Sequence, residues 1–465
     1  MEIEWARSRY ELKWFSATST YVAKKRKAKE RRRRNLYTQS LHEWRRSRTR
    51  AREPGPKASP SQRHLFAELH PLGIWPVSDN VEPNDGVVGI RIPETFSFIE
   101  NPSETLGTLY RLRAAVENPR TREVFFDHTK CKRLDLCASV VADVLVLRGK
   151  RQRSFRGSNF NVRGVFSSEP DVNVLLKASG ILKHLGVPNA ILPKDVEQRL
   201  KLCSLWTGKP VSPDRTSECE LAATDLTRFF DTCLSTERYV LRDEWKSKLI
   251  SLITEVLDNC EQHANREKYW YTIGHFNQLE GEAGGECHIV IFNLGDSIYE
   301  SLKREDTPLA LRRRISDLAS LHRKRGFLGM GKPHWEEDAL WTLYALQEGV
   351  SRFTDGPGGE DRGNGTVRMI KFFTDLAGDR PKMALISGET YILFDGKYHL
   401  EDKLLTENEK RKIIAFNQEN DLETPPDKNY VKSLPFKFPG TLVSLRFILS
   451  KEILKGVREV VDERH

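Results

Sequence analysis

The chain lacks any apolar run as long as the roughly 18 residues that a membrane-spanning helix needs. Its nearest approach, residues 134–147, is shorter and contains Asp135 and Asp143. The N-terminus begins MEIEWARSRY and has no apolar stretch of the kind found in secretory signals. Charged residues make up 30% of the chain, and the mean hydropathy is −0.55. These features predict a cytoplasmic protein without a membrane partner.

Paired cysteines are also lacking. Seven cysteines, an odd number, are spread along the chain without a CxxC pair, and no Cys/His spacing matches a zinc site. In a cytoplasmic protein this pattern indicates reduced thiols packed in the interior.

A chain of 465 residues is too long for one core of ordinary size, so we expect two or three domains.

Acidic residues are scarce at the N-terminus. Residues 1–60 hold 18 Lys and Arg against 6 Asp and Glu, a net charge of +12, whereas the rest of the chain carries −2. We expect a basic arm, helical or disordered, that ends in the Pro-rich residues 53–60. Residues 24–52 could bind nucleic acid through its phosphates. A solvated tail or a helix that docks on a protein neighbour is the alternative.

A smaller α/β domain is predicted over residues 61–212. Residues 124–127 have the composition of a short buried strand, and residues 134–147 and 172–185 carry apolar side chains at helical spacing. A strand followed by a helix and another strand is typical of a layered α/β sheet. No catalytic group of residues is recognisable in this part.

The first chemical motif lies on a predicted helix over residues 246–264. Its apolar positions form one buried stripe, and Glu255, Asn259 and His263 are spaced so that they line up along one edge beside it. A polar row beside a core face is costly unless it lines a pocket. An amide oxygen there can bind Mg²⁺, and a carboxylate one turn away can orient a water. Taken alone, the row also fits an amphipathic helix with a solvated edge.

Three further segments follow in order. A predicted strand at 288–292 runs into Asn293 and Gly295. A helical stretch then begins with Arg362-Gly363-Asn364-Gly365-Thr366. A last strand spans 439–447. Across about 240–450 this order resembles the GHKL family of ATP-binding proteins, which includes histidine kinases, DNA gyrase, heat-shock chaperones and MutL-type proteins. The resemblance implies an α+β sandwich over 213–465 that binds ATP and Mg²⁺ under a lid at 303–335. The predicted domain at 61–212 is loosely similar to STAS-like domains that precede some bacterial GHKL ATPases.

The resemblance assigns roles to individual residues. It implies that Glu255 is the general base that activates the attacking water and that Asn259 is the Mg²⁺ ligand. His263 completes the cofactor-binding edge of this helix. Gly363 and Gly365 would let backbone N–H groups approach phosphate at a helix N-terminus.

The adenine end of the expected site is carried by Asn293, Gly295 and Thr441. The family places Asp where this chain has Asn293. An amide oxygen can also accept from the adenine amino group, but the amide adds donors and lacks the charge. Ser297 stands where a second glycine is common, so the turn is expected to differ.

Nine basic residues against three acidic ones occupy positions 303–332, where the family keeps its lid. Such a lid could close over a triphosphate, or the segment could be a solvated helix. The function implied is a Mg²⁺-dependent ATPase that acts as a nucleotide-driven switch on a protein partner, with a homodimer possible. The alternatives are a protein kinase of the histidine-kinase or anti-sigma class and a nucleotide-sensing module without hydrolysis. Asn293 favours the last alternative, and Glu255 argues against it.

Overall fold

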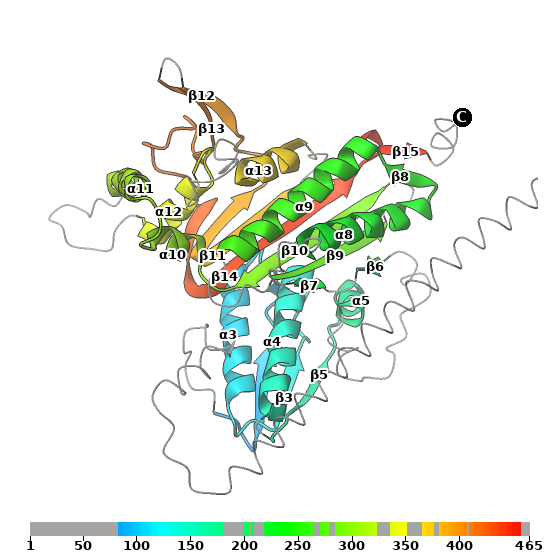
Figure 1. Ribbon diagram of the computed structural model, residues 1–465. Helices are drawn as coiled ribbons and strands as arrows, with labels where there is room; N and C mark the ends of the chain where they lie inside the picture. The colour runs from blue at the N-terminus through cyan, green and yellow to red at the C-terminus, as the bar shows by residue number, and fades with distance from the viewer. Residues whose placement is uncertain are drawn as a thin grey trace, which may run out of the picture. The chain divides into compact units, whose positions relative to one another are not determined.

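The computed structural model describes residues 82–155, 157–179, 200–203, 206–208, 218–263, 270–278, 284–322, 335–350, 365–375, 381–406 and 409–456 (Figure 1). These residues all belong to one compact unit of the chain. The predicted basic arm, residues 1–60, lies outside the described residues.

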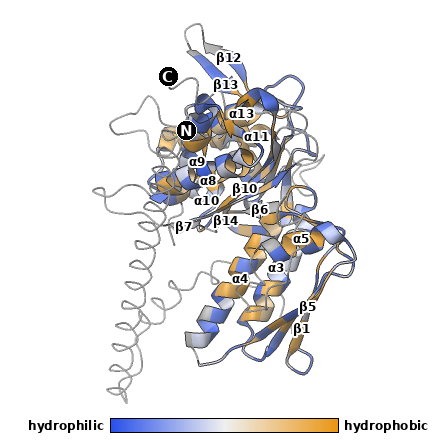
Figure 2. Cartoon of the chain, turned by 90° about the vertical axis from the view of Figure 1, so that its right-hand side faces the viewer, coloured by the Kyte–Doolittle hydropathy of each residue, from blue (hydrophilic) through white to orange (hydrophobic). Residues whose placement is uncertain are grey.

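A three-stranded parallel sheet with the order β1-β3-β5 organises the N-terminal part. Alternate residues of β3 are buried, and α3 and α4 lie side by side along the sheet (Figure 1). Figure 2 shows the apolar segments that run through α4 and these strands. The elements of this part are β1 (Val87–Arg91), β2 (Thr95–Phe96), α3 (Pro102–Glu117), β3 (Glu123–Asp127), β4 (Arg133–Leu134), α4 (Leu136–Phe155), β5 (Asn161–Val165) and α5 (Pro170–Ala178).

The C-terminal part is built on an antiparallel sheet with the order β11-β14-β10-β9-β6, and β7 also pairs with β9. The sheet strands are β6 (Leu200–Leu202), β7 (Trp206–Gly208), β9 (Trp270–Gln278), β10 (Gly285–Leu294), β11 (Lys382–Phe394) and β14 (Val431–Leu449). The helices are α8 (Glu218–Ser235), α9 (Asp243–His263), α10 (Ile298–Lys303), α11 (Leu309–His322), α12 (Glu337–Ala345) and α13 (Gly365–Asp375). Smaller elements are β8 (Tyr239–Leu241), β12 (Glu401–Thr406), β13 (Glu409–Ile413), the 3₁₀ helix η3 (Lys451–Ile453) and β15 (Leu454–Gly456).

Both faces of the antiparallel sheet are buried. On β10, Ile289 and Ile291 pack into a core shared with α8, α9, α12 and α13. Val290 and Phe292, which point the other way, pack into a second core with the N-terminal part. The antiparallel sheet is therefore buried between helices on one face and the N-terminal part on the other.

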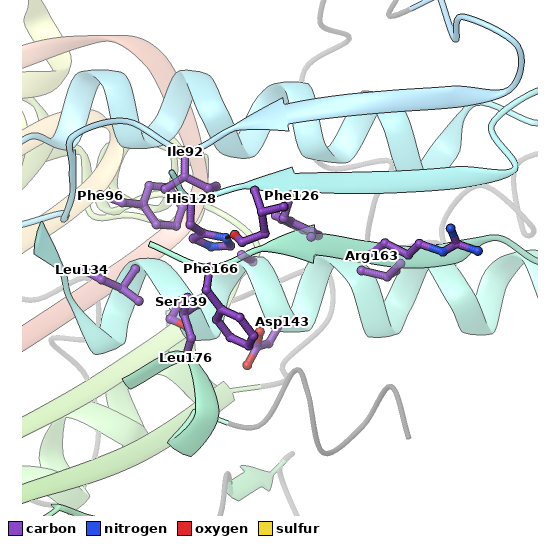
Figure 3. Close-up of a pocket in the computed structure, with 14 residues that line it drawn as sticks. Ile92, Phe96, Phe126, His128, Leu134, Ser139, Asp143, Arg163, Phe166 and Leu176 are labelled. Atoms are coloured by element: carbon purple, nitrogen blue, oxygen red, sulfur yellow. Dashed lines mark hydrogen bonds between the residues drawn. The ribbon is translucent and has the colours of Figure 1, made fainter. Parts of the chain in front are cut away.

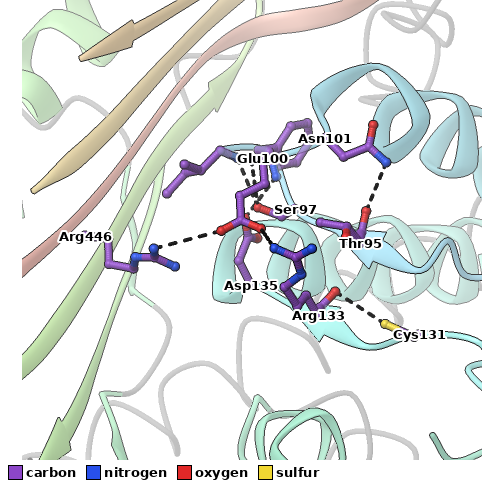
Figure 4. A network of polar contacts seen from close by, with 10 residues as sticks. Thr95, Ser97, Glu100, Asn101, Cys131, Arg133, Asp135 and Arg446 are labelled. Atoms are coloured by element: carbon purple, nitrogen blue, oxygen red, sulfur yellow. Dashed lines mark hydrogen bonds and ion pairs between the residues drawn. The ribbon is translucent and has the colours of Figure 1, made fainter. Parts of the chain in front are cut away.

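Polar contacts join the N-terminal part to the second face of the sheet. The buried hydroxyl of Tyr391 on β11 donates to the carbonyl oxygen of Ile99 at 2.6 Å. Glu100 contacts Arg446 of β14 at 4.0 Å and Arg133 at 3.0 Å (Figure 4). Burial raises the pKa of Asp135, whose carboxylate accepts from the backbone N–H groups of Phe98 and Ala138.

The predicted mixed α/β class is confirmed, with a parallel sheet first and antiparallel sheets after it. The predicted helix at 246–264 corresponds to α9, and the predicted strands at 288–292 and 439–447 lie within β10 and β14. Strands β9 and β11 were not predicted, and β6 and β7 join the C-terminal sheet although they precede residue 213. Among the described helices, none is long and apolar enough to cross a membrane.

Candidate functional site

Helix α9 positions the first two predicted site residues. Leu249, Ile253 and Leu257 form its buried stripe, which packs into the core above the antiparallel sheet. Glu255 and Asn259 lie one turn apart and are half-buried at the edge of this stripe. His263 is the last residue of α9, and its side chain lies outside what the structure describes.

The second glycine box meets α9 at Glu255. The described part of helix α13 starts at Gly365, and a Cβ added there would lie 1.8 Å from Oε1 of Glu255. No residue other than glycine fits this position unless the carboxylate moves. The described start of α13 therefore lies against the Glu255 side chain. Gly363 lies outside the described residues.

Asn293, Thr441 and Ser387 form a second group, on β10, β14 and β11. Asn293 is opposite Thr441 in the strand register, and Thr441 is opposite Ser387. The Thr441 N–H donates to Oδ1 of Asn293 at 2.9 Å, and the hydroxyls of Thr441 and Ser387 are 2.8 Å apart. Asn293 and Ser387 are buried, and Thr441 is half-buried.

The hydrogen bond from Thr441 fixes which way the Asn293 amide points. Its oxygen faces the backbone N–H of Thr441 and keeps one further lone pair. Among the described residues, the NH₂ group of Asn293 has no hydrogen-bond partner. Asn293 can therefore offer donors to a ligand as well as one acceptor position.

The two groups lie in the same layer of the molecule. Strand residues alternate between faces, so Asn293, Ser387 and Thr441 share the face of Ile291, Leu385 and Val443. Those three apolar residues belong to the core beneath α9 and α13. The structure thus brings Glu255 into contact with Gly365, and Asn293 into contact with Thr441, on one side of the sheet.

The first glycine box differs from the family pattern for a local reason. The Gly295 N–H donates to the carbonyl oxygen of Pro439 at 3.1 Å, which fixes the end of β10 against β14. Ser297 is the N-cap of α10 and forms a capping box with Glu300. A glycine at this position would lack the capping hydroxyl.

In residues 303–322 of the predicted lid, which the structure describes, some basic side chains contact other groups of the protein. Lys303 pairs with Glu337 and lies over the ring of Trp341. Arg304 lies 3.7 Å from a carboxylate oxygen of Asp296. The side chains of Arg313 and Arg314 on α11 are exposed to solvent. Residues 323–334 lie outside the described residues.

Sequence reasoning missed a cluster between α8 and α9. The ligand atoms of Cys219, Asp258 and Glu261 lie within 4.8 Å of one another, and Trp270 Nε1 donates to Glu261 at 2.8 Å. Burial, together with both carboxylates, raises the pKa of the Cys219 thiol, and burial raises the pKa of Asp258. The thiol is protonated at neutral pH and lies close to both acids. No motif revealed the cluster because Cys219 and Asp258 belong to different helices.

No family model, curated protein or solved structure matches this chain. The fold and the site define a mixed α/β protein whose antiparallel sheet has helices on one face and the parallel α/β part on the other. Of the candidate site residues, Glu255, Asn259, Asn293, Gly365 and Thr441 lie on the helical side.

Proposed function

We propose that residues 213–465 bind ATP with Mg²⁺ on the helical side of the antiparallel sheet and hydrolyse it, as a nucleotide-driven switch on a protein partner. The observation that carries this proposal is the contact between Gly365 and Glu255. In this proposal the glycine-rich residues at the start of α13 bind a phosphate, and the Glu255 carboxylate beside Gly365 activates a water. The order of α9, β10, α13 and β14, which resembles the GHKL family, supports it.

Each candidate residue has chemistry that fits its proposed role. The Asn259 amide oxygen is a suitable Mg²⁺ ligand, and it lies one helical turn from the Glu255 carboxylate, the proposed proton acceptor. N–H groups at the start of α13 would bind phosphate oxygens. Asn293 and Thr441 would contact the base, and exposed bases on α11 would balance the phosphate charge.

A nucleotide sensor without hydrolysis is the second candidate, and Asn293 favours it. Asn293 carries no charge and already accepts from Thr441, so its hold on the adenine amino group is weaker than that of a carboxylate. Both candidates require nucleotide binding. They differ only in turnover.

Binding and turnover of ATP test the proposal on the full-length protein. Titration calorimetry should show Mg²⁺-dependent ATP binding that Asn259→Ala abolishes. Glu255→Gln preserves the shape of the side chain that contacts Gly365. It should keep ATP binding and lower the rate of phosphate release by roughly 10²- to 10⁴-fold. Glu244→Gln, an exposed change on the same helix, is the matched control and should change neither quantity.

A third variant tests the contact itself. Gly365→Ala forces a methyl group onto the Glu255 carboxylate and should weaken ATP binding, whereas Gly89→Ala, which has open space around it, should not. A parent protein that fails to bind ATP would refute both candidates. Binding without phosphate release, unchanged by Glu255→Gln, would favour the sensor.

A further inference from the structure

A cavity of about 340 Å³ lies at the carboxyl edge of the parallel sheet (Figure 3). The strands β1, β3 and β5 end in register at Arg91, Asp127 and Val165. The residue that follows each strand lines the cavity: Ile92, His128 and Phe166. Ligands of parallel α/β sheets bind beyond the carboxyl ends of the strands, which is where this cavity lies.

Most of the cavity wall is apolar. Besides Ile92 and Phe166, the strands and helices contribute Phe96, Phe126, Leu134, Ala142, Val162 and Leu176. Close-packed interiors contain few voids larger than a water molecule, so a cavity of this size and lining is typical of a small-molecule site. An apolar cavity of about 150 Å³ is large enough for benzene. The volume here therefore fits a molecule of two fused rings.

Two charged side chains line the cavity, one of each sign, and both already have partners. Arg163 pairs with Glu123 at 3.2 Å, and its side chain is 71% exposed. Asp143 is 5% exposed and is engaged in an interaction within the protein. A charged ligand would have to displace one of these contacts or enter the apolar part without a counter-charge, and both are costly. The lining therefore favours an uncharged ligand.

The remaining polar side chains of the lining are Ser139 and His128. The hydroxyls of Ser139 and Ser179 share a hydrogen bond of 2.9 Å. Nδ1 of His128 lies 3.3 Å from the carbonyl oxygen of Val165, which can only accept, so Nδ1 carries the proton. Burial lowers the pKa of His128, so the ring is uncharged at neutral pH and Nε2 is an acceptor. Among the described residues no group donates to Nε2, which leaves one acceptor for a ligand.

Aromatic side chains accompany this acceptor. The rings of Phe126 and His128 are stacked with their centres 6.1 Å apart, and Figure 3 shows His128 among the apolar side chains of the lining. Phe166 is 47% exposed, which leaves aromatic surface in water beside an apolar cavity. A flat ring bound there would remove this surface from water and contact the phenylalanines.

From this geometry we infer that the cavity binds an uncharged molecule of two fused rings, one of them aromatic, that carries one N–H or O–H donor. The rings lie among the phenylalanines, and the donor forms a hydrogen bond to Nε2 of His128. This site is independent of the proposed nucleotide function, because no residue is shared between the two.

Three bicyclic probes of nearly equal shape test the inference on the full-length protein. 1,2,3,4-Tetrahydroquinoline is uncharged at neutral pH and has one N–H, chroman has an ether oxygen in its place, and 1,2,3,4-tetrahydroisoquinoline is a cation. Titration calorimetry should detect tetrahydroquinoline. Chroman should bind about fivefold more weakly because it lacks the donor. Tetrahydroisoquinoline should bind more weakly by about tenfold or more because its charge must be buried.

A variant tests the acceptor. His128→Phe keeps a flat ring beside Phe126 and removes Nε2. It should lower the affinity for tetrahydroquinoline to that for chroman and leave the affinity for chroman unchanged. A loss confined to the probe with the donor identifies the hydrogen bond, because a general distortion of the cavity would weaken both probes.

The location is tested by filling the cavity. Ala142→Leu adds three carbons inside it and should abolish binding of tetrahydroquinoline, whereas Ala114→Leu on α3, which does not line the cavity, should keep it. Circular dichroism confirms that the variants fold, and the probe series on the parent protein stays decisive if one does not. Equal affinity for tetrahydroquinoline and chroman, or tighter binding of the cation, would overturn the inference. The absence of tetrahydroquinoline binding, or binding unaffected by Ala142→Leu, would overturn it as well.

Discussion

Two histidines face each other across β9 and β10 on the side of the sheet that packs against the N-terminal part. His275 and His288 are opposite each other in the strand register. Burial lowers the pKa of His275 to about 4 and that of His288 to about 3. His288 Nε2 lies 2.8 Å from the Ser444 hydroxyl, whereas the buried Nε2 of His275 has no hydrogen-bond partner among the described residues. Both rings are neutral in the folded protein.

This pair predicts a pH dependence of stability. Between about pH 6.5 and pH 4 the unfolded chain binds protons that the folded chain does not, so the stabilisation is complete above pH 6.5 and is lost as the pH falls. His275→Leu removes one of the two groups. It should reduce the slope of the unfolding free energy against pH by about 1.4 kcal/mol per pH unit around pH 5. Urea denaturation at a series of pH values measures this slope.

An exposed histidine supplies the control for this pH series. His399→Leu should leave the slope as in the parent protein, since its ring is exposed outside the sheet. If His275→Leu also kept the parent slope, His275 would not be a buried neutral group.

At the scale of elements, short helices depend on how their ends are capped. In α10 the Ser297 hydroxyl accepts from the Glu300 N–H at 3.2 Å, and the Glu300 carboxylate accepts from the Ser297 N–H at 2.9 Å. The same carboxylate pairs with Lys437 of β14, which ties the helix to the sheet. Hydrogen bonds to Lys437 and Ser297 lower the pKa of Glu300 against the effect of burial.

Removing this cap gives a prediction for the element. Ser297→Ala should lower the unfolding free energy by about 1 kcal/mol, because the N–H of Glu300 loses its acceptor. Ser450→Ala is the matched control, since Ser450 is the N-cap of η3 without a capping hydrogen bond. Chemical denaturation compares the two variants. An equal effect of both would mean that the capping box does not stabilise α10.

At the scale of the whole molecule, charge is separated along the chain. Residues 1–60 carry +12, and the remainder carries −2. Without the arm the protein has little long-range attraction for phosphate. Residues 24–52 are therefore proposed as a nucleic-acid-binding segment, with a protein neighbour as the alternative partner.

Deletion of residues 1–60 tests the arm. Full-length protein should bind duplex DNA with little sequence preference and with a log–log salt slope of about −0.9 for each phosphate contact. The deletion variant should lose most of this affinity and keep ATP binding. Fluorescence anisotropy over a salt series measures both proteins. If the full-length protein binds neither DNA nor RNA at low salt, the arm is a protein-docking element.

Much of the helical side of the sheet could be predicted from the sequence. The apolar spacing of α9, the apolar run of β10 and the Gly-Thr of β14 are visible within short windows, because a helix or strand buries side chains at a fixed period. Charge and hydropathy are likewise sums over residues, so the separated basic arm is visible without any structure.

Only the tertiary structure decided which of these segments meet. The contact of Gly365 with Glu255, the hydrogen bond from Thr441 to Asn293 and the His275–His288 pair join residues that are distant in the chain or matched only by strand register. The cavity at the ends of β1, β3 and β5 exists because three parallel strands stop in register beside α4. Local periodicity fixes each element, whereas register and packing between elements depend on the whole core, which no short window of sequence contains.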